Sequence, residues 1–482
     1  MERRNPDEQS LFELLLKQRG IYVFCALFLC FAFRYYSRDF WFDECLTLDL
    51  IFYCPDTLTV YQTYDIPNNH IVFSILLRFW ILFLGKCLPD LYLMLFRLLP
   101  MVCACGAAVW IFRTLQRKFS AYCAWCVALC FCMTPPFLIY GTGLRGYILG
   151  FLLTCGGVAA ARSILKYGKI RYYIFYSLLA LLAVGTAPTN LASFVAISLL
   201  FFPAVMNNKR NILPLLYLFL SPFVCLAIFY LPIFEKFKGC IALKEGWYSA
   251  GAAAWHFYAT VFLILLPCIL MFRIRKKLKW YAVMLLLTIL IPAGVYLVFP
   301  TAPFPRVFLP LLAVWCFPAG YGVGAFLCRF PAGKKYIPVL LVFFWCALVT
   351  IFSPRIGDLL FGNGWQDDLM APYYVREDFM PSVTVQRLEQ CRKEYPDAVF
   401  YMTFESDYPA LLFATAHWAD RDSVMWYDRP NQNRLQSLPE TGTLYFITRD
   451  ETDMEAARKR FSLPFPVERI SCGSQNIWRF TR

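Results

Sequence analysis

Residues 212–233 read ILPLLYLFLSPFVCLAIFYLPI, a run of 22 residues without a charged side chain. A helix needs about 20 mainly apolar residues to cross the hydrocarbon core of a bilayer. Comparable runs recur from Ile21 to Ser353 and then stop. The sequence therefore predicts a chain that crosses a membrane many times up to about residue 353 and continues as a part of soluble composition.

The composition of the whole chain agrees with this division. Of its 482 residues 59% are hydrophobic and only 16% are charged, which lies outside the usual range of soluble globular proteins. The net charge of +14 is unevenly distributed, because residues 1–353 carry +18 while the part from Arg355 onward has 15 Lys and Arg against 19 Asp and Glu, net −4. The basic excess belongs to the membrane part, so we expect no nucleic-acid partner.

Most basic residues of the membrane part form six short clusters between apolar runs. These are Arg3/Arg4/Lys17/Arg19, Arg113/Arg117/Lys118, Arg162/Lys166/Lys169/Arg171, Lys209/Arg210, Arg273 to Lys279, and Arg329/Lys334/Lys335. Positive charge close to helix ends is retained on the cytoplasmic side of a membrane. A correct set of spans should therefore place all six clusters on one face.

Eleven expected spans satisfy this requirement. They are roughly 21–36, 90–112, 120–140, 146–162, 172–187, 190–206, 212–233, 254–272, 280–299, 306–328 and 337–353. The run from Ile71 to Gly85 has to be left out, because counting it would move five clusters to the outer face. We interpret it as a helix lying in the membrane interface, with Arg78 extending toward water.

The predicted fold is thus an all-α polytopic membrane bundle with a small C-terminal α/β domain outside the membrane. Residues 1–353 form the membrane domain, with juxtamembrane helices in a first outer loop at about 37–89, and residues 354–482 form the soluble domain. Strands are expected at Val399–Thr403 and Thr443–Thr448, and a helix at Pro409–Trp418. We expect a cytoplasmic N-terminus, an extracytoplasmic C-terminal domain, and a structural role for His417.

The first outer loop concentrates the acidic residues of the membrane part. It contains Asp39, Asp43, Glu44, Asp49, Asp56 and Asp65. Two of these are adjacent in Trp41-Phe42-Asp43-Glu44, and long loops of this kind are often functional. The alternative is that the acids only solvate an exposed loop. Asn69 and His70 end the loop directly before the interfacial helix, where His70 could also serve as a polar helix cap.

Two outward arginines stand apart from the basic clusters. Arg145 precedes Gly146 and Tyr147, and Arg306 lies in Phe304-Pro305-Arg306-Val307-Phe308, each at the outer end of an expected span. A guanidinium group matches a phosphate bidentately, so a phosphate would explain both positions. The alternatives are anchoring to lipid headgroups or ion pairing with the acidic loop.

These motifs, in this order, resemble the GT-C superfamily of membrane glycosyltransferases. The resemblance is to bacterial enzymes related to protein O-mannosyltransferases, lipid A aminoarabinose transferases and lipopolysaccharide-core galacturonosyltransferases. The matching elements are Trp41-Phe42-Asp43-Glu44, Asn69-His70-Ile71-Val72, Phe96-Arg97-Leu98-Leu99-Pro100, Leu144-Arg145-Gly146-Tyr147 and Arg306-Val307-Phe308-Leu309-Pro310. The chain departs from the family in lacking both prolines after His70, and Phe308 lies one residue later than the usual aromatic.

The resemblance implies a transferase that takes a sugar from a polyprenyl-phosphate donor and passes it, with inversion, to a lipid, glycan or protein acceptor. Asp43 and Glu44 would be catalytic, Asp43 as general base and Glu44 binding the acceptor or orienting Asp43. Arg145, Arg306 and Arg97 would bind the donor phosphate, and His70, Asn69 and Tyr147 would bind substrate. The enzyme would act in the bacterial inner membrane.

Two arginines can neutralise the leaving phosphate, so we expect no required cofactor and no metal site; a divalent metal at Asp43 and Glu44 is the alternative. The C-terminal domain would dock the acceptor or cap the outer cavity. A multi-span transporter and a non-catalytic lipid-phosphate-binding membrane protein are the competing functions. Transporters place ionisable groups near the bilayer midplane and often have inverted halves, and the sequence shows neither.

Overall fold

The computed structural model describes most of the chain. The described residues are 20–63, 69–87, 95–207, 212–242, 248–272, 279–298, 301–302, 304–331, 334–362, 368–403, 406–416, 418–420, 424–427, 442–473 and 475–481. They form two compact units. The helical unit comprises Met1–Tyr36 and Leu50–Pro372, and the C-terminal unit comprises Ser37–Asp49 and Tyr373–Arg482. A short piece of the first outer loop therefore belongs to the same unit as the tail.

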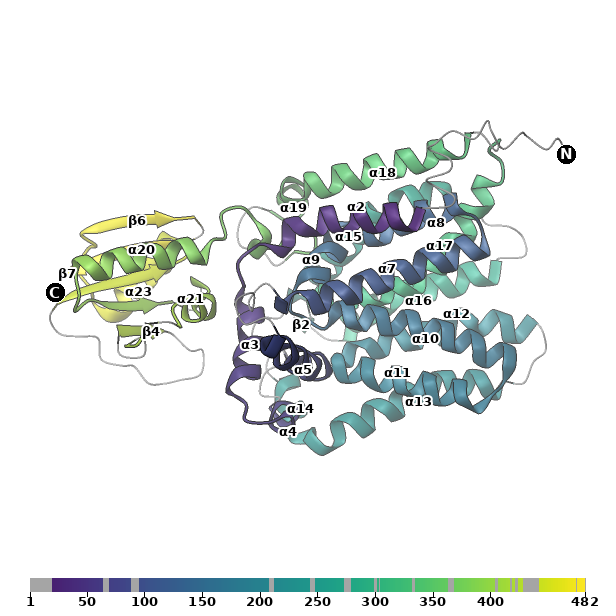
Figure 1. The fold of residues 1–482 in the computed structure, drawn as a ribbon, viewed down its shortest axis with the longest axis horizontal. Coiled ribbons are helices and arrows are strands. Elements are labelled where there is room, and N and C mark those ends of the chain that lie inside the picture. The colour runs from purple at the N-terminus through teal and green to yellow at the C-terminus, as the bar shows by residue number, and fades with distance from the viewer. Residues whose placement is uncertain are drawn as a thin grey trace. The chain divides into compact units, whose positions relative to one another are not determined.

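The helical unit is built from apolar helices, most of which run alongside one another (Figure 1). In chain order they are α2 (Gly20–Tyr36), α5 (Ile71–Cys87), α7 (Leu98–Lys118), α8 (Ala121–Cys132), α9 (Pro135–Thr142), α10 (Tyr147–Tyr167), α11 (Ile170–Thr186), α12 (Leu191–Asn207), α13 (Leu213–Tyr230), α15 (Ala250–Met271), α16 (Lys279–Val298), α17 (Leu312–Leu327) and α18 (Tyr336–Ile351). Shorter elements are α4 (Thr57–Gln62), η3 (Pro188–Asn190), η4 (Leu231–Ile233), α14 (Phe234–Ala242), η6 (Pro305–Leu311) and α19 (Ser353–Phe361). α3 (Phe42–Tyr53) begins in the C-terminal unit and ends in this one.

Each of the eleven expected spans contains a helix, but the number of crossings is not confirmed. Among the described residues five helices are long and apolar enough to cross a membrane, or up to seven if each of two bent pairs is one span. One bent pair is α8 and α9, which meet at 66°. Pro135 and Pro136 cause this break because proline cannot donate a helical hydrogen bond. At the break, the Met133 carbonyl accepts a hydrogen bond from the Thr350 hydroxyl at 3.2 Å.

α10 lies among several neighbours, packing against α7, α11, α12 and α17. Small residues allow this close packing, since a side chain at Gly157 would meet the Phe194 ring at 3.0 Å. The helix ends at Gly168, whose φ of 63° is left-handed and whose N–H reaches the Ile164 carbonyl. The direction of α10 fixes which residues lie at each end of the unit.

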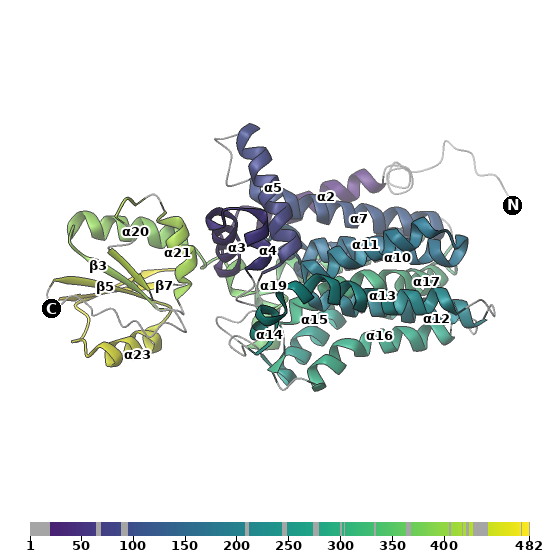
Figure 2. The ribbon, with the colours of Figure 1, turned by 90° about the horizontal axis from the view of Figure 1, so that it is seen from below.

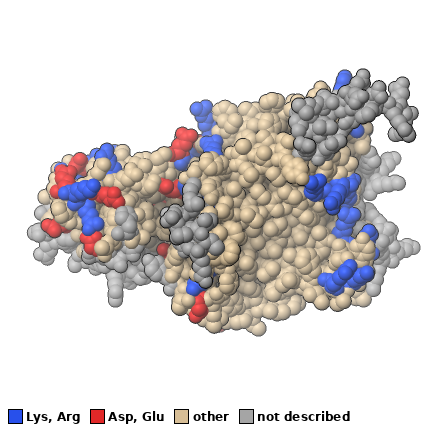
Figure 3. Space-filling view, viewed as in Figure 1, with Lys and Arg blue, Asp and Glu red and all other residues tan. Residues whose placement is uncertain are grey.

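Basic side chains gather at one end of the helical unit (Figure 3). Lys118 at the end of α7 interacts electrostatically with Arg162 near the end of α10. The Lys118 ammonium also lies 4.2 Å from the ring centroid of Tyr321 in α17. Two of the clusters that the sequence predicted to share a face therefore do share an end, while Arg145 lies at the opposite end of α10.

Helix α5 is fastened to the end of α3. The Arg78 guanidinium donates hydrogen bonds to the carbonyls of Ile51, Cys54 and Pro55 at 3.1, 2.6 and 2.9 Å. Those carbonyls lie at or just past the last turn of α3, where helix carbonyls lack intrahelical partners. Arg78 was expected to extend toward water; in the structure it caps the end of α3 instead.

The C-terminal unit contains a five-stranded mixed sheet of order β4-β3-β5-β7-β6. Its elements are β3 (Val399–Met402), β4 (Met425–Tyr427), β5 (Thr443–Thr448), β6 (Glu468–Cys472), β7 (Gln475–Thr481), η8 (Tyr373–Val375), α20 (Pro381–Glu394), α21 (Tyr408–Ala414) and α23 (Glu451–Phe461). β3 is parallel to β4 and β5, while β7 is antiparallel to β5 and β6. The two strands and the helix expected from sequence are present as β3, β5 and α21; His417 lies outside the described residues.

Two hydrophobic clusters cover the two faces of this sheet. α20 and α21 lie on one face and α23 on the other (Figure 2). Leu388 and Leu411 pack with Phe400 and Ile477 on the first face. On the second, Met454 of α23 packs with Phe446. Alternating side chains of each strand thus fill both cores, as expected for an α/β sandwich.

Candidate functional site

The two lone arginines meet at one tyrosine of the helical unit. Arg145 ends the turn before α10, and Arg306 lies in η6, which leads into α17. Their side chains are almost fully buried, at 1% and 3% exposure. Arg306 Nε donates a hydrogen bond to the Tyr147 hydroxyl at 3.1 Å, and the Arg145 guanidinium lies 5.9 Å from the Tyr147 ring centroid. Residues that are far apart in sequence are therefore brought together here.

His70 joins the same group. Its Nδ1 lies 3.1 Å from the Thr186 carbonyl, and its ring packs edge-on against Tyr147 with centroids 4.6 Å apart. Because a carbonyl can only accept, Nδ1 is assigned the hydrogen, and Nε2 is then an acceptor. Nε2 is buried and has no hydrogen-bond partner among the residues that the structure describes. Its lone pair is therefore available to a donor on a ligand.

The pKa of His70 is lowered well below its usual value. Burial is the main cause, and the positive charge of Arg145 adds to it; the Thr186 carbonyl opposes the shift and Arg306 reinforces it. His70 is therefore neutral at physiological pH. We name the set of His70, Arg145, Tyr147 and Arg306 the arginine cluster. Two buried cations beside a neutral acceptor suit an anion that also carries a donor group.

Gly146 lets the arginine cluster close. A Cβ atom there would lie 2.4 Å from Thr186 Cγ2, which is closer than unbonded atoms approach, and 3.0 Å from His70 Nδ1, which is a tight contact. Its φ of −71° is ordinary, so glycine is needed for space and not for conformation. The turn between Arg145 and Tyr147 can therefore lie directly against His70.

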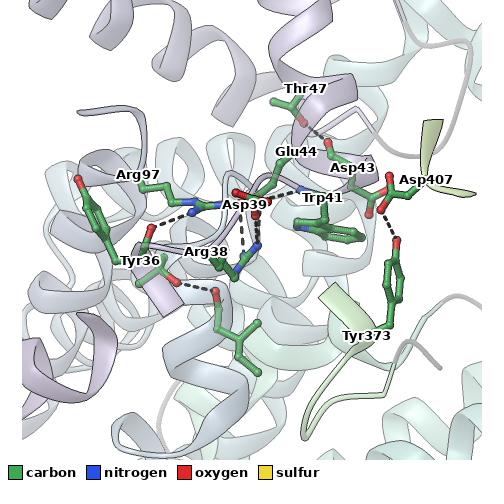
Figure 4. A network of polar contacts seen from close by, with 12 residues as sticks. Tyr36, Arg38, Asp39, Trp41, Asp43, Glu44, Thr47, Arg97, Tyr373 and Asp407 are labelled. Atoms are coloured by element: carbon green, nitrogen blue, oxygen red, sulfur yellow. Dashed lines mark hydrogen bonds and ion pairs between the residues drawn. The ribbon is translucent and has the colours of Figure 1, made fainter. Parts of the chain in front are cut away.

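The tandem acids lie in the first turn of α3, in the C-terminal unit. Glu44 is fully buried, and its Oε2 accepts hydrogen bonds from Arg38 Nη1 at 3.0 Å and from the Trp41 N–H at 3.3 Å. The second bond is that of a capping box, in which the third helical residue reaches back to the N-cap amide. Asp43, 7% exposed, precedes it. Figure 4 shows this group. Glu44 thus holds the turn that presents Asp43.

Segment 37–49 is fixed to the tail by aromatic contacts. The Trp41 ring stacks on Tyr374 with centroids 3.8 Å apart and planes 9° apart. Phe40 contacts Phe413 edge-on. A hydrogen-bonded contact adds to these, since Asp39 Oδ2 accepts from the Ser382 N–H and hydroxyl at 2.9 and 2.7 Å. The C-terminal unit therefore includes Asp43 and Glu44, although these residues come from the first outer loop.

The remaining predicted site residues are placed differently. Arg97, at the start of α7, donates to the Tyr36 carbonyl at the end of α2 (2.7 Å). The Asn69 amide donates to the carbonyls of Val60 and Thr63, and its oxygen accepts from the Ser74 hydroxyl. These contacts join α4 to α5 and indicate a structural use of Asn69. Its assignment and that of Arg97 to substrate stay predictions. Asp65 lies outside the described residues.

Sequence reasoning missed Arg38 and Asp407. Arg38 could have been suspected, because it is a basic residue six positions before a buried acid. Asp407 had no local signal; it is 3% exposed and lies beside Asp43 in the folded unit. Its partner Tyr373 donates a hydrogen bond to Asp407 Oδ2 at 3.2 Å. Only the folded chain brings these residues to the acids.

Among the described residues the acids do not form a group suited to a metal ion. The Glu44 carboxylate is already engaged by Arg38, and in the described part of the chain there is no group of three His, Cys, Asp or Glu side chains that could hold one. Glu44 is therefore occupied as an ion-pair partner and helix cap. The expectation that no cofactor is required stays a prediction.

Comparison with known proteins identifies solved structures with a similar fold. The sequence matches no protein-family model and no curated protein. Among solved structures it is similar to ArnT from Cupriavidus metallidurans in the apo state, with a TM-score of 0.51 and 12% identity over 96% of this chain and 98% of that one. The same protein bound to undecaprenyl phosphate gives a TM-score of 0.51 and 11% identity over the same shares. The chain therefore has a fold similar to that of ArnT, in agreement with the resemblance that its motifs indicated.

Replacing Gly146 tests the close approach. Gly146→Ala forces a methyl group against Thr186 and His70, and overpacking of this kind costs about 1–3 kcal/mol. We expect a lower melting temperature of the purified protein in detergent. Gly251→Ala, where nothing lies within 4 Å, is the control and should not lower it. Equal melting temperatures for the two variants would contradict the described packing.

Replacing Glu44 tests the buried ion pair. Glu44→Gln preserves the capping box but leaves Arg38, which is 9% exposed, facing a neutral group, and breaking a buried pair costs about 3–5 kcal/mol. The C-terminal unit should unfold at lower denaturant concentration, followed by tryptophan fluorescence of the full-length protein. Glu455→Gln breaks the more exposed pair with Arg458 and should cost about 0–1 kcal/mol. A similar loss in both variants would refute a special role for Glu44.

Proposed function

We propose that this protein is a membrane glycosyltransferase that takes a sugar from a polyprenyl-phosphate donor. The observation that carries the proposal is the burial of Arg145 and Arg306 around Tyr147, beside the neutral His70. A guanidinium group matches phosphate oxygens bidentately, so two buried arginines at one tyrosine suit a phosphate ligand. The likeness to the ArnT structure bound to undecaprenyl phosphate supports a lipid phosphate as that anion.

Each group has one task in the proposed reaction. Arg145 and Arg306 bind the phosphate oxygens, and Tyr147 orients Arg306 through its hydroxyl. His70 Nε2 accepts a hydrogen bond from the donor molecule. As the bond between the anomeric carbon and the phosphate oxygen breaks, the arginines balance the charge that develops on the leaving phosphate.

Asp43 is the proposed general base. The acceptor hydroxyl or amine attacks the anomeric carbon from the side opposite the phosphate, and its proton passes to the Asp43 carboxylate. One displacement of this kind inverts the configuration of the sugar and leaves polyprenyl phosphate as the second product. Glu44 orients Asp43 through the capped first turn of α3, which its contacts with Arg38 and Trp41 favour over acceptor binding.

The cellular setting follows from the same proposal. The basic end of the helical unit faces the cytoplasm, and the arginine cluster, at the other end of α10, faces the outside. The protein would lie in the bacterial inner membrane with its N-terminus cytoplasmic and its C-terminal unit extracytoplasmic. The acceptor is a lipid, glycan or protein that reaches that face.

Three activities can be separated in one experiment. Purified protein in liposomes is incubated with a set of labelled polyprenyl-phosphate sugars and an extract of envelope lipids and glycans. Transfer of label to an acceptor supports the proposal. Movement of intact donor across the bilayer would indicate a transporter, and retention of donor without either would indicate a lipid-phosphate-binding protein; both results would overturn the proposal.

Removing the base tests the role of Asp43. Asp43→Asn keeps the shape of the side chain but cannot take a proton, and a positioned base contributes about 10²–10⁴-fold to a rate. We expect transfer to fall by at least that range while expression, membrane insertion and binding of undecaprenyl phosphate persist. An active Asn variant would refute the assignment.

The arginines are tested by binding. A hydrogen bond to a charged group contributes about 1.5–3 kcal/mol, so Arg145→Lys and Arg306→Lys, which lose bidentate geometry, should each weaken binding of undecaprenyl phosphate about 10-fold or more. Native mass spectrometry of the detergent-solubilised protein measures this. Arg171→Lys, at the basic end of the unit, is the matched control. Equal affinities in all three variants would exclude the arginine cluster as the phosphate site.

A further inference from the structure

Asp407 is a buried acid that neither the motifs nor the proposed chemistry uses. It precedes α21, is 3% exposed, and accepts a hydrogen bond from the Tyr373 hydroxyl. Its carboxyl group and that of Asp43 point toward one another (Figure 4), and the two interact electrostatically. Both residues belong to the C-terminal unit.

The backbone at Asp407 is also unusual. Its φ of 58° and ψ of 47° are left-handed, and among the described residues only Asp407 and Ser462 combine a positive φ with a side chain. This conformation costs a non-glycine residue on the order of 1–2 kcal/mol, less for Asp and Asn. Strained positions of this kind cluster at functional sites. The fold therefore keeps an acid in a strained, buried position facing the candidate base.

We propose that Asp407 is a positioning residue for Asp43, holding a proton and presenting it to the Asp43 carboxylate. This rests on the proposed function of Asp43 as general base. Protonated, Asp407 adds a donor that fixes the orientation of the Asp43 carboxylate. Asp407 and Asp43 both belong to the C-terminal unit, so this pairing is made within one unit.

The protonation state of Asp407 supports this role. Burial raises its pKa from 3.8 to about 7; the Tyr373 hydroxyl and the Phe42 N–H oppose the rise, and the negative charge of Asp43 adds to it. The described titratable groups around Asp407 are Asp43 of α3, Tyr373 of η8 and Tyr408 on its own helix. Asp407 is thus protonated below about pH 7 and ionises above it, placing a second negative charge against Asp43.

Two substitutions of Asp407 separate the effect of its proton from the effect of its backbone conformation. Asp407→Asn keeps a hydrogen-bond donor that cannot ionise, and Asp407→Gly removes the side chain; both residue types tolerate positive φ. We expect Asp407→Gly to lower kcat at pH 6.5 at least about tenfold with little change in KM for the donor lipid. Asp407→Asn should recover most of that loss. In the unmodified protein kcat should fall as pH rises through about 7, and the Asn variant should lack that fall.

Matched variants control for position and chemistry. Asp453→Asn alters another partly buried acid of the same unit, which accepts from the Thr403 hydroxyl. Ser462→Gly alters the other residue with a positive φ. Both should keep the kcat and pH profile of the unmodified protein. Unchanged kcat in Asp407→Gly, or an Asp407→Asn variant that still loses activity as pH rises through about 7, would overturn the proposal.

A spectroscopic readout makes the test independent of turnover. In pH-difference infrared spectra the protonated-carboxyl band of Asp407 should vanish as pH rises through about 7, be absent in Asp407→Asn, and titrate at lower pH in Asp43→Asn because a negative neighbour is gone. A band unaffected by Asp43→Asn would refute the pairing. If the coupling is present but no donor sugar is transferred, the proposed function fails and the pairing of the two acids stands.

Discussion

Two guanidinium groups held out of water around a single tyrosine are the constraint on which the helical unit depends. Arg145 and Arg306 repel one another, and their burial removes the hydration that would stabilise them. Several contacts hold the two side chains in place. The Tyr147 hydroxyl accepts a hydrogen bond from Arg306, and burial keeps His70 neutral. Gly146 leaves space for the turn before α10 to pack against His70. α5, α10, α11 and η6 all contribute to this one place.

The residues of that arrangement could be predicted from sequence, because they carry charged or polar side chains at the expected outer ends of apolar helices. Arg145 and Arg306 stood out as arginines outside the basic clusters, and His70 as a histidine directly before an apolar helix. These are local signals, and the side of the membrane is set by charges near helix ends. In the structure these three residues lie close to Tyr147. The number of crossings could not be fixed in the same way, because Pro135 bends one expected span by 66°.

The acids were harder to predict beyond their position in the first loop. Asp43 and Glu44 are adjacent in sequence, yet it is Glu44 that accepts hydrogen bonds from Arg38 and from the Trp41 N–H. That difference depends on where the first turn of α3 begins, and the amino-acid composition of the loop does not predict that position. Asp407 and Tyr374 lie more than 300 positions from the acids, and no periodicity or motif links segments so far apart. Long-range packing of Trp41 on Tyr374 had to be seen in the folded unit.

The order of strands in the C-terminal unit has a consequence for synthesis. β7, the last strand, lies inside the sheet between β5 and β6, so the sheet is incomplete until Thr481 has left the ribosome. Segment 37–49 bonds to this unit across 343 positions, from Asp39 to Ser382. At about 5–20 residues per second, the first loop waits on the order of tens of seconds for its partner. A nascent chain in which β7 has not yet formed therefore lacks the complete unit that anchors these acids.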